Sequence, residues 1–254
     1  MCRGCHRGCG EADPKIHGVN PARTEYKFVI STKQRDRLCE EIGGRMGVDQ
    51  APGNEGRYPI VSQYYDSPER DCYWEKARRL QSRRKIRVRM YGSDLSEIPP
   101  AGFVEIKHKL DGVGGKRRLP VSVDVARRFA AGEQDALRDM LRTVGRSGRM
   151  IINEVFDMVE RNGHGPAMQI RYDRSAFTTP DEMFRVTFDS DLLCRSGAHP
   201  LRPDDPDYTQ QILDPDLVML EVKSIGPVPY WFRVWIAEAG LTRESFSKYC
   251  TAVE

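Results

Sequence analysis

Every second residue of the segment KIRVRMY, residues 85–91, is basic. These residues are Lys85, Arg87 and Arg89, and apolar side chains occupy the positions between them. A period of two predicts a β-strand with one apolar face and one wholly cationic face. Because neighbouring like charges repel each other, the cationic face requires negatively charged groups opposite it.

The same alternation of charged and apolar residues recurs along most of the chain. We expect strands at Arg23–Ile30, Tyr58–Tyr65, Lys85–Tyr91, Gly102–Leu110, Lys116–Leu119, 167–174, 183–190 and 216–224. We expect helices from a cap at Ser31 or Thr32 to about Gly43, from Ser67 to about Gln81, and at 122–131, 133–144, 148–160 and 229–240. Strands of similar length with helices grouped between them predict an α+β fold with a mainly antiparallel sheet.

The polar faces of these strands consist almost entirely of Arg, Lys and carboxylate residues. Their cations are Arg23, Lys27, Lys85, Arg87, Arg89, Lys107, Lys109, Arg171, Arg185 and Lys223, and their carboxylates are Glu25, Glu105, Asp173, Asp189 and Glu221. Each strand alone is explained well by a solvated face, but solvated faces usually carry Thr, Ser and Gln as well. The whole chain has a net charge of only +3. Positive charge is therefore concentrated on one face of the strands.

A closed barrel with this face inward would enclose a charged tunnel. Burying an unpaired charge costs several kcal/mol, whereas the total stability of a protein is only about 5–15 kcal/mol. The tunnel must therefore contain water and bind an anion. Closely spaced Arg and Lys suit a phosphate chain. The carboxylates would orient the cations or bind a hard cation such as Mg2+ or Mn2+.

The charged motifs, in their order along the chain, resemble the triphosphate tunnel enzymes of the CYTH-like superfamily, and within it the VTC-type polyphosphate polymerase domain. The motifs are RTEYK (23–27), YDSP (65–68), RKIRVR (84–89), VEIK (104–107), RYDRSAF (171–177), RVTFD (185–189), EVK (221–223) and SKY (247–249). The resemblance extends from about Arg23 to Tyr249. Hydrolytic relatives carry Glu at the position of Arg23, and this difference favours the polymerase branch.

The resemblance implies a closed antiparallel barrel with helices packed outside. It also implies a divalent-metal-dependent enzyme that transfers the terminal phosphoryl group of ATP to polyphosphate. By this resemblance the catalytic residues are Lys27, Arg87, Arg89, Lys107, Arg171, Arg185 and Lys248. The substrate-binding residues are Arg23, Lys85, Lys109, Lys116, Lys223 and Ser247, and the ligands of Mn2+ or Mg2+ are Glu221, Glu25 and Glu105. Such transfer needs positioning and electrostatic stabilisation rather than a protein nucleophile.

Two other functions fit the same residues. A tunnel domain that catalyses no reaction could bind polyphosphate or inositol phosphates as a sensor. The presence of Glu221 argues instead for metal binding and catalysis. A triphosphatase or cyclase of the same superfamily is the second alternative, against which Arg23 counts. Nucleic acid is not an expected partner, because the cations are predicted to face inward. No apolar run reaches the roughly 20 residues that span a bilayer, so coupling to transport would need a membrane-protein partner.

The first residues of the chain are rich in Gly and Cys. We expect residues 1–21 to be a disordered tail, followed by a single domain over residues 22–254. A zinc site or a haem attachment is the alternative for the cluster Cys2, Cys5, His6 and Cys9. Haem attachment normally requires export, and no hydrophobic signal segment is present. The remaining cysteines are scattered singly and are interpreted as reduced thiols of a cytoplasmic protein.

Overall fold

The structure is a computed structural model, and it describes residues 23–49, 56–92, 102–202 and 204–254. Within this description, the backbone of Arg23 is placed but its side chain is not. The expected tail at 1–21 and its cysteine cluster lie outside the described residues, so they stay predictions.

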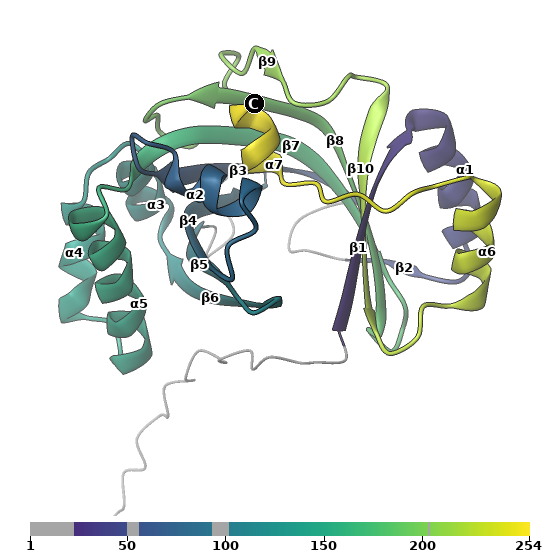
Figure 1. Cartoon of the computed structure of the whole chain (residues 1–254), viewed down its shortest axis with the longest axis horizontal. Coiled ribbons are helices and arrows are strands. Elements are labelled where there is room, and N and C mark those ends of the chain that lie inside the picture. Colours follow the sequence, from purple (N-terminus) through teal and green to yellow (C-terminus); the bar gives the residue numbers. More distant parts are fainter. Residues whose placement is uncertain (1–22, 50–55, 93–101, 203) are drawn as a thin grey trace, which may run out of the picture.

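One antiparallel sheet forms the centre of the molecule (Figure 1). In spatial order its strands are β1 (Arg23–Ser31), β10 (Leu217–Ile225), β8 (Phe184–Ser196), β7 (Gly165–Thr178), β3 (Arg57–Asp66), β4 (Ser82–Tyr91), β5 (Gly102–Leu110) and β6 (Val113–Val121). Two short strands extend the sheet, since β2 (Gly47–Val48) pairs with β7 and β9 (Gln210–Gln211) pairs with β8. The predicted α+β class and the antiparallel pairing are therefore confirmed.

The sheet is curled but open, so the prediction of a closed barrel is wrong for the described residues. The order of strands ends at β1 on one side and at β6 on the other, and no pairing joins these two edges within the described residues. Figure 1 shows the sheet arching between them. Closure depends on the tilt and stagger of the strands. Alternation along a strand predicts which faces differ, but it carries no information about whether two edge strands meet.

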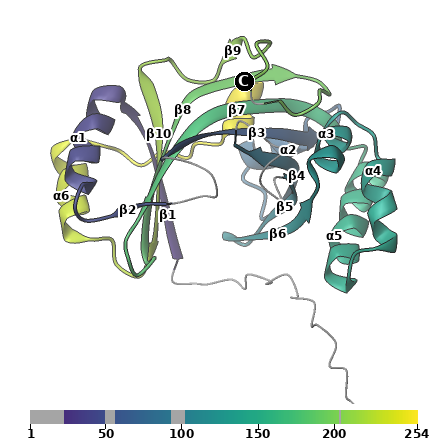
Figure 2. The same cartoon turned by 180° about the vertical axis from the view of Figure 1, so that it is seen from behind.

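Helices α1 (Thr32–Ile42) and α6 (Tyr230–Glu238) cover the outer face of β1, β10 and β8 (Figures 1 and 2). Helix α1 begins at Ser31, whose side chain and that of Gln34 form a capping box. Its buried Leu38 packs in one apolar cluster with Phe28 of β1 and Phe232 of α6. The apolar residues of these strands therefore face outward into a helix-covered core, and the charged residues face the concave side.

A second group of helices covers the outer face at the other end of the sheet (Figure 2). These elements are α3 (Val123–Ala130), α4 (Asp135–Arg138), the 3-10 helix η1 (Asp139–Arg142), α5 (Arg146–Phe156) and the π-helix η2 (Asp157–Arg161). Phe129 and Ile152 from these helices pack with Ile86, Val88 and Ile106 of β4 and β5. The basic residues between these aliphatic positions must therefore lie on the opposite, concave face.

Two short helices lie beside the concave side of the sheet. Helix α2 (Asp71–Ala77) is shorter than the predicted Ser67–Gln81, because Arg70 at its N-cap has a left-handed backbone with a φ of 62°. Helix α7 (Lys248–Val253) packs Tyr249 against Tyr64 of β3, with ring centroids 5.4 Å apart. Among the described residues, no helix combines the length and apolar character needed to cross a membrane.

Candidate functional site: a basic concave face

The register of the sheet directs the cationic side chains of β4 to its concave side. Residues directly opposite each other in paired strands point their side chains to the same face. Arg87 lies opposite Tyr64 in β3 and Glu105 in β5. We call the resulting surface the basic concave face. Its cations are Lys27, Lys85, Arg87, Arg89, Lys107, Lys109, Lys116, Arg118, Arg174, Arg185, Lys223 and Lys248.

Glu105 anchors three cations on β4 and β6. Arg87 donates from Nε to Oε2 of Glu105 at 2.5 Å, and Arg118 Nη2 lies 2.6 Å from Oε1. Lys116 Nζ lies 3.5 Å from the same oxygen. Burial alone would raise the pKa of this carboxyl, but Arg87 and the other neighbouring cations hold its pKa well below the usual range. Glu105 is therefore ionised, and its oxygens are already engaged by cations.

Arg89 lies deep in the basic concave face, with only 5% of its surface exposed. Its Nε donates to Ser62 Oγ at 3.0 Å. Its guanidinium carbon lies 5.9 Å from the ring centroids of both Tyr91 and Tyr172. Burial would raise the pKa of Tyr91, yet Arg89 and neighbouring cations lower it to about 8. The positive charge around this phenol is therefore large enough to outweigh the effect of burial on its pKa.

The pKa of Lys107 also shows this surplus of positive charge. The side chain of Lys107 is exposed and lies opposite Lys85, on the same face as Arg87 and Arg89. The positive charge of Arg87 is the largest of the causes that lower the pKa of Lys107 well below its usual range. Since like charges disfavour each other's ionised form, an anion bound at this point would restore the charge of Lys107.

A second cluster of opposite charges joins β1 and β10. Lys27 Nζ lies 3.3 Å from Glu25 and 3.9 Å from Glu221. Lys223 contacts Glu221 closely and lies 3.9 Å from Glu25. Burial would raise the pKa of Glu221, but Lys223 and Lys27 hold it well below its usual range. Glu25 and Glu221 thus share the same two lysines and offer carboxylate oxygens, which suit a hard divalent cation.

The sequence prediction grouped Glu105 with Glu25 and Glu221 as metal ligands. Within the described residues, the oxygens of these three carboxylates do not gather at metal-ligand distance, and only Glu25 and Glu221 share their cation partners. In the described parts of the chain, Glu105 instead forms ion pairs with Arg87, Lys116 and Arg118. Its position predicts that Glu105 orients Arg87 and Arg118. From the sequence, this role was left open as the alternative to metal binding.

A third cluster is centred on Asp189 of β8, which is fully buried. It accepts hydrogen bonds from Arg174 of β7 and from Lys248 of α7. Both cations also flank the ring of Tyr172, at 5.4 and 4.7 Å from its centroid. The Tyr172 hydroxyl has no hydrogen-bond partner among the described residues, and burial raises its pKa to about 12. It is therefore a protonated donor that faces the cluster without a partner.

Arg171 is not part of this face, so its predicted position was wrong. Tyr172 and Arg174 lie opposite Ile60 and Tyr58 of β3, whose side chains point to the concave side, and Arg171 therefore points to the outer side. There Arg171 forms an ion pair of 3.0 Å with Asp173, the other member of the predicted polar face. The alternation of β7 was identified correctly, but the face turned toward the site is the other one.

The sequence prediction missed Arg174 and Tyr172, and for Arg118 it left open a tunnel-mouth group or a solvated basic loop. The signal for Arg174 was present, since it lies within the motif RYDRSAF, two positions after the site-facing Tyr172. Arg118 lies within GGKRR, where alternation with Lys116 places both on one face. Only the pairing of β6 with β5, which places Arg118 opposite Glu105, distinguishes Arg118 from the cations of a solvated loop.

The remaining predicted residues lie around the same face. Lys85 lies 4.9 Å from the ring centroid of Tyr249. Lys109 lines a pocket of about 770 Å³ near α2 and α7. Arg185 pairs with Asp49 at 2.6 Å. Ser247 caps α7 by accepting a hydrogen bond from the backbone of Cys250, so the structure gives it a helix-cap contact.

The fold is an open, curled antiparallel sheet with clusters of cations on its concave face. The chain belongs to the VTC domain family, whose profile matches residues 22–254. No curated protein matches the chain in sequence.

The chain is similar to solved structures at low sequence identity. A candidate adenylyl cyclase from Hippeastrum, described as having a dominant triphosphatase activity, is 12% identical with a TM-score of 0.54, and the alignment covers 90% of this chain and 94% of that one. A candidate adenylate cyclase from Vibrio parahaemolyticus is 12% identical with a TM-score of 0.45, covering 91% and 98%. At this identity the likeness to the Hippeastrum protein concerns the fold alone.

Proposed function

We propose that this domain transfers the terminal phosphoryl group of ATP to a polyphosphate chain that lies along the basic concave face. The observation that carries the proposal is the surplus of cations there. The carboxylates Glu25, Glu105, Asp189 and Glu221 each contact more than one cation. Cations such as Arg89 and Lys107 have no carboxylate contact in the described part of the chain. A polyanion would complete this arrangement.

The proposed transfer requires no protein nucleophile. The bond between the γ-phosphorus and its bridging oxygen breaks, a terminal oxygen of the acceptor chain bonds to the γ-phosphorus, and ADP leaves. Arg87, Arg89 and Lys107 would stabilise the negative charge on the transferred group. Glu105 would hold Arg87 in place, since the two are directly hydrogen-bonded.

The cluster around Asp189 would bind a neighbouring phosphate. Arg174 and Lys248 are fixed by their common carboxylate partner. The unpartnered hydroxyl of Tyr172 would donate a hydrogen bond to a phosphate oxygen between them. Arg174 thereby takes the role that the sequence prediction gave to Arg171. The phosphate chain would continue toward β1, where it would contact Lys27, Lys223 and Arg185.

The residues present also fit the divalent metal that the superfamily implies. Glu25 and Glu221 would hold Mn2+ or Mg2+, because both offer carboxylate oxygens and the lowered pKa of Glu221 keeps it ionised. The bound ion would neutralise part of the phosphate charge. Lys27 and Lys223 would keep both carboxylates oriented.

Triphosphate hydrolysis is the second candidate function, and the Hippeastrum protein of similar fold is described as having a dominant triphosphatase activity. In that reaction water would replace the acceptor chain, and the same cations would stabilise the transferred group. Arg23 favours the polymerase over the hydrolase, because the hydrolytic members of the superfamily that the sequence resembles carry a glutamate at this position. The two functions differ in product, so a single assay separates them.

The test is to incubate the purified full chain with ATP and Mn2+ and to measure ADP, free phosphate and polyphosphate on a gel. The polymerase predicts ADP with a polymer ladder, and both disappear in the double variant Arg87→Ala/Arg89→Ala. Arg57→Ala is the matched control, because Arg57 pairs with Asp173 and Asp191 on the outer side. ADP and free phosphate without polymer would instead establish a triphosphatase. Tight polyphosphate binding without turnover would establish a binding module.

A further inference from the structure

A cluster of three potential metal ligands lies outside the contacts described so far. Asp66 is the last residue of β3, Cys72 lies in α2 and His164 immediately precedes β7. One ligand atom from each lies within 4.8 Å of the other two. All three side chains are buried, with exposed fractions of 3%, 1% and 5%.

Asp66 is held firmly in this cluster. Its Oδ1 accepts hydrogen bonds of 2.8 Å from the backbone N–H groups of Ser67 and Cys72. Its Oδ2 accepts a hydrogen bond from the hydroxyl of Tyr249 in α7. A carboxylate ligand oriented by such outer hydrogen bonds is typical of a built metal site.

His164 supplies an independent indication of a ligand. Its Nδ1 is buried and has no hydrogen-bond partner in the described parts of the chain. Buried polar atoms are normally satisfied, so an unpartnered one requires an explanation. The Cys72 thiol lies 3.3 Å from the carbonyl oxygen of Arg84 and 3.9 Å from that of Tyr65, and it also interacts with the Asp66 carboxylate. A thiol and an imidazole with an unused nitrogen therefore lie close together.

We propose that Asp66, Cys72 and His164 form a zinc site distinct from the proposed metal position at Glu25 and Glu221. Thiolate, imidazole and carboxylate together suit Zn2+, whereas the oxygen pair on β1 and β10 suits Mg2+ or Mn2+. Zinc bonds of about 2.0–2.3 Å in a tetrahedron place ligand atoms roughly 3.5 Å apart. Because the three ligand atoms lie within 4.8 Å of one another, each would move inward by at most about 1 Å. Binding converts the Cys72 thiol to a thiolate and releases its proton to solvent.

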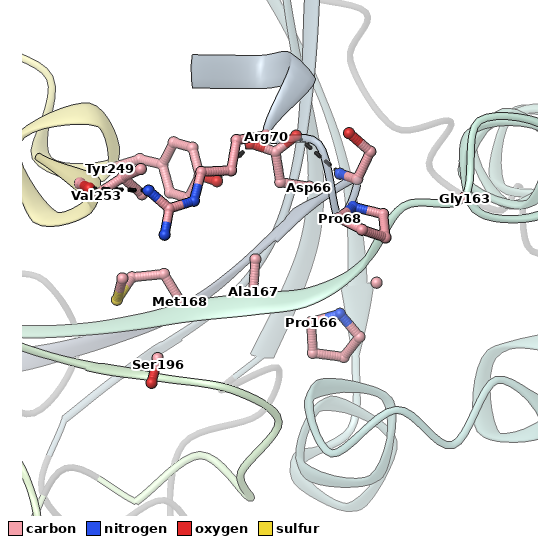
Figure 3. Close-up of a pocket in the computed structure, with 12 residues that line it drawn as sticks. Asp66, Pro68, Arg70, Gly163, Pro166, Ala167, Met168, Ser196, Tyr249 and Val253 are labelled. Carbon is pink, nitrogen blue, oxygen red and sulfur yellow. Dashed lines mark hydrogen bonds between the residues drawn. The ribbon is translucent and has the colours of Figure 1, made fainter. Parts of the chain in front are cut away.

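A water molecule would complete the coordination. A pocket of about 310 Å³ reaches Asp66 and is lined also by Tyr249, Pro166 and Arg70 (Figure 3). Figure 3 shows Asp66 and Tyr249 on one side of this pocket and Ala167 and Pro166 on the other. The pocket would give an ion and a water molecule a path to the Asp66 carboxylate.

A bound ion would join separate elements of the fold. The three ligands come from the end of β3, from α2 and from the residue before β7. Through the hydroxyl of Tyr249, the site also contacts α7, whose first residue Lys248 pairs with Asp189. Zinc would thus hold the elements that position one wall of the basic concave face.

The experiment uses the full-length chain with Cys2→Ser, Cys5→Ser and Cys9→Ser as its background, because the N-terminal cysteines are themselves candidate zinc ligands. Zinc is titrated against a chromophoric chelator, and Co2+ is used as a spectroscopic probe for thiolate coordination. We expect one tightly bound Zn2+ per chain and a thiolate-to-Co2+ charge-transfer band. Both are lost in Cys72→Ser and in His164→Gln and are unchanged in Cys194→Ser, another buried free cysteine.

Circular dichroism of each variant establishes that it is folded before titration, and the two ligand variants serve as independent checks of each other. The proposal is overturned if the background variant binds no Zn2+. It is equally overturned if folded Cys72→Ser or His164→Gln keeps stoichiometric binding, or if Co2+ binds without a thiolate band. None of these readouts depends on phosphoryl transfer, so the failure of the proposed function leaves this test intact.

Discussion

The guanidinium of Arg174 forms a two-point ion pair with the carboxylate of Asp189 on the neighbouring strand. Nε lies 2.6 Å from Oδ1, and Nη2 lies 2.8 Å from Oδ2. Lys248 reaches the same Oδ2 at 2.5 Å from a different element. Burial alone would raise the pKa of Asp189, but Arg174 and Lys248 lower it to about 2. One ionised carboxylate therefore fixes two cations before any phosphate binds. This reduces the conformational entropy that the two side chains lose when phosphate binds.

This arrangement predicts unequal effects for two arginines on the same strand. Arg174→Ala should lower the rate of phosphoryl transfer by about 100-fold, the usual cost of losing one donor that stabilises charge in the transition state. Arg171→Ala should leave the rate within about threefold, because Arg171 pairs with Asp173 on the outer side. Steady-state kinetics of ADP release, with thermal melts to confirm folding, would check both. Equal losses in the two variants would contradict the assigned faces.

The contrast between these arginines marks the limit of what the sequence could predict. Alternation along 167–174 identified a strand correctly, and the polar residues of one face were assigned to the site by analogy with the other strands. In β7 that face packs outward, and the site receives Tyr172 and Arg174 instead. A period of two fixes two faces but not their direction, since a shift by one residue exchanges them. Only the pairing with β3 resolves the choice.

We expect the substitution of Glu105 to change the stability of the protein rather than its dependence on metal. Glu105→Gln would leave Arg87, Arg118 and Lys116 without their common negative partner. Removing one partner from a buried ion cluster should lower the free energy of unfolding by about 3 kcal/mol, measured by urea denaturation. Tripolyphosphate should restore more stability to this variant than to the wild type, because it supplies the missing negative charge. An unchanged urea midpoint would contradict the anchoring role.

The fold was more predictable from sequence than the closure of its sheet. Each expected strand is present because the alternation is strong and the turns between strands are rich in Gly and Pro. The capped start of α1 at Ser31 was also predictable from the cap residue. The open edges at β1 and β6 were not, since they depend on tilt and stagger along the whole sheet. The ligand cluster of Asp66, Cys72 and His164 was likewise invisible, because its members meet only in the folded chain.

Lys107 predicts that phosphate binding is coupled to proton uptake. Its lowered native pKa means that the unfolded chain binds more protons between that pKa and the ordinary value of about 10.4. The stability of the free protein should therefore rise with pH in that interval. A bound anion opposes the repulsion from Arg87 and Arg89 and raises the pKa of Lys107 again. Calorimetry of tripolyphosphate binding in buffers of different ionisation enthalpy should detect uptake of up to about one proton.

Lys107→Met is the matched variant for this measurement, since it keeps the length of the side chain without its charge. The variant should bind tripolyphosphate more weakly and should lose most of the buffer dependence. Its free energy of unfolding should also depend less on pH in the alkaline range. Retention of the full proton uptake would assign it to another group, and Tyr91 with its pKa of about 8 is the nearest such candidate.

The metal assignment predicts that Glu221 and Glu105 behave differently toward Mn2+. Glu221→Gln removes an ionised ligand between Lys27 and Lys223, so the Mn2+ concentration for half-maximal activity should rise at least about tenfold. Glu105→Gln should lower the maximal rate without this shift, because Glu105 contacts cations rather than the Glu25 and Glu221 pair. The check is to titrate Mn2+ at saturating ATP with each variant. A comparable shift in both would return Glu105 to the metal site, and no shift in Glu221→Gln would place the metal elsewhere on the basic concave face.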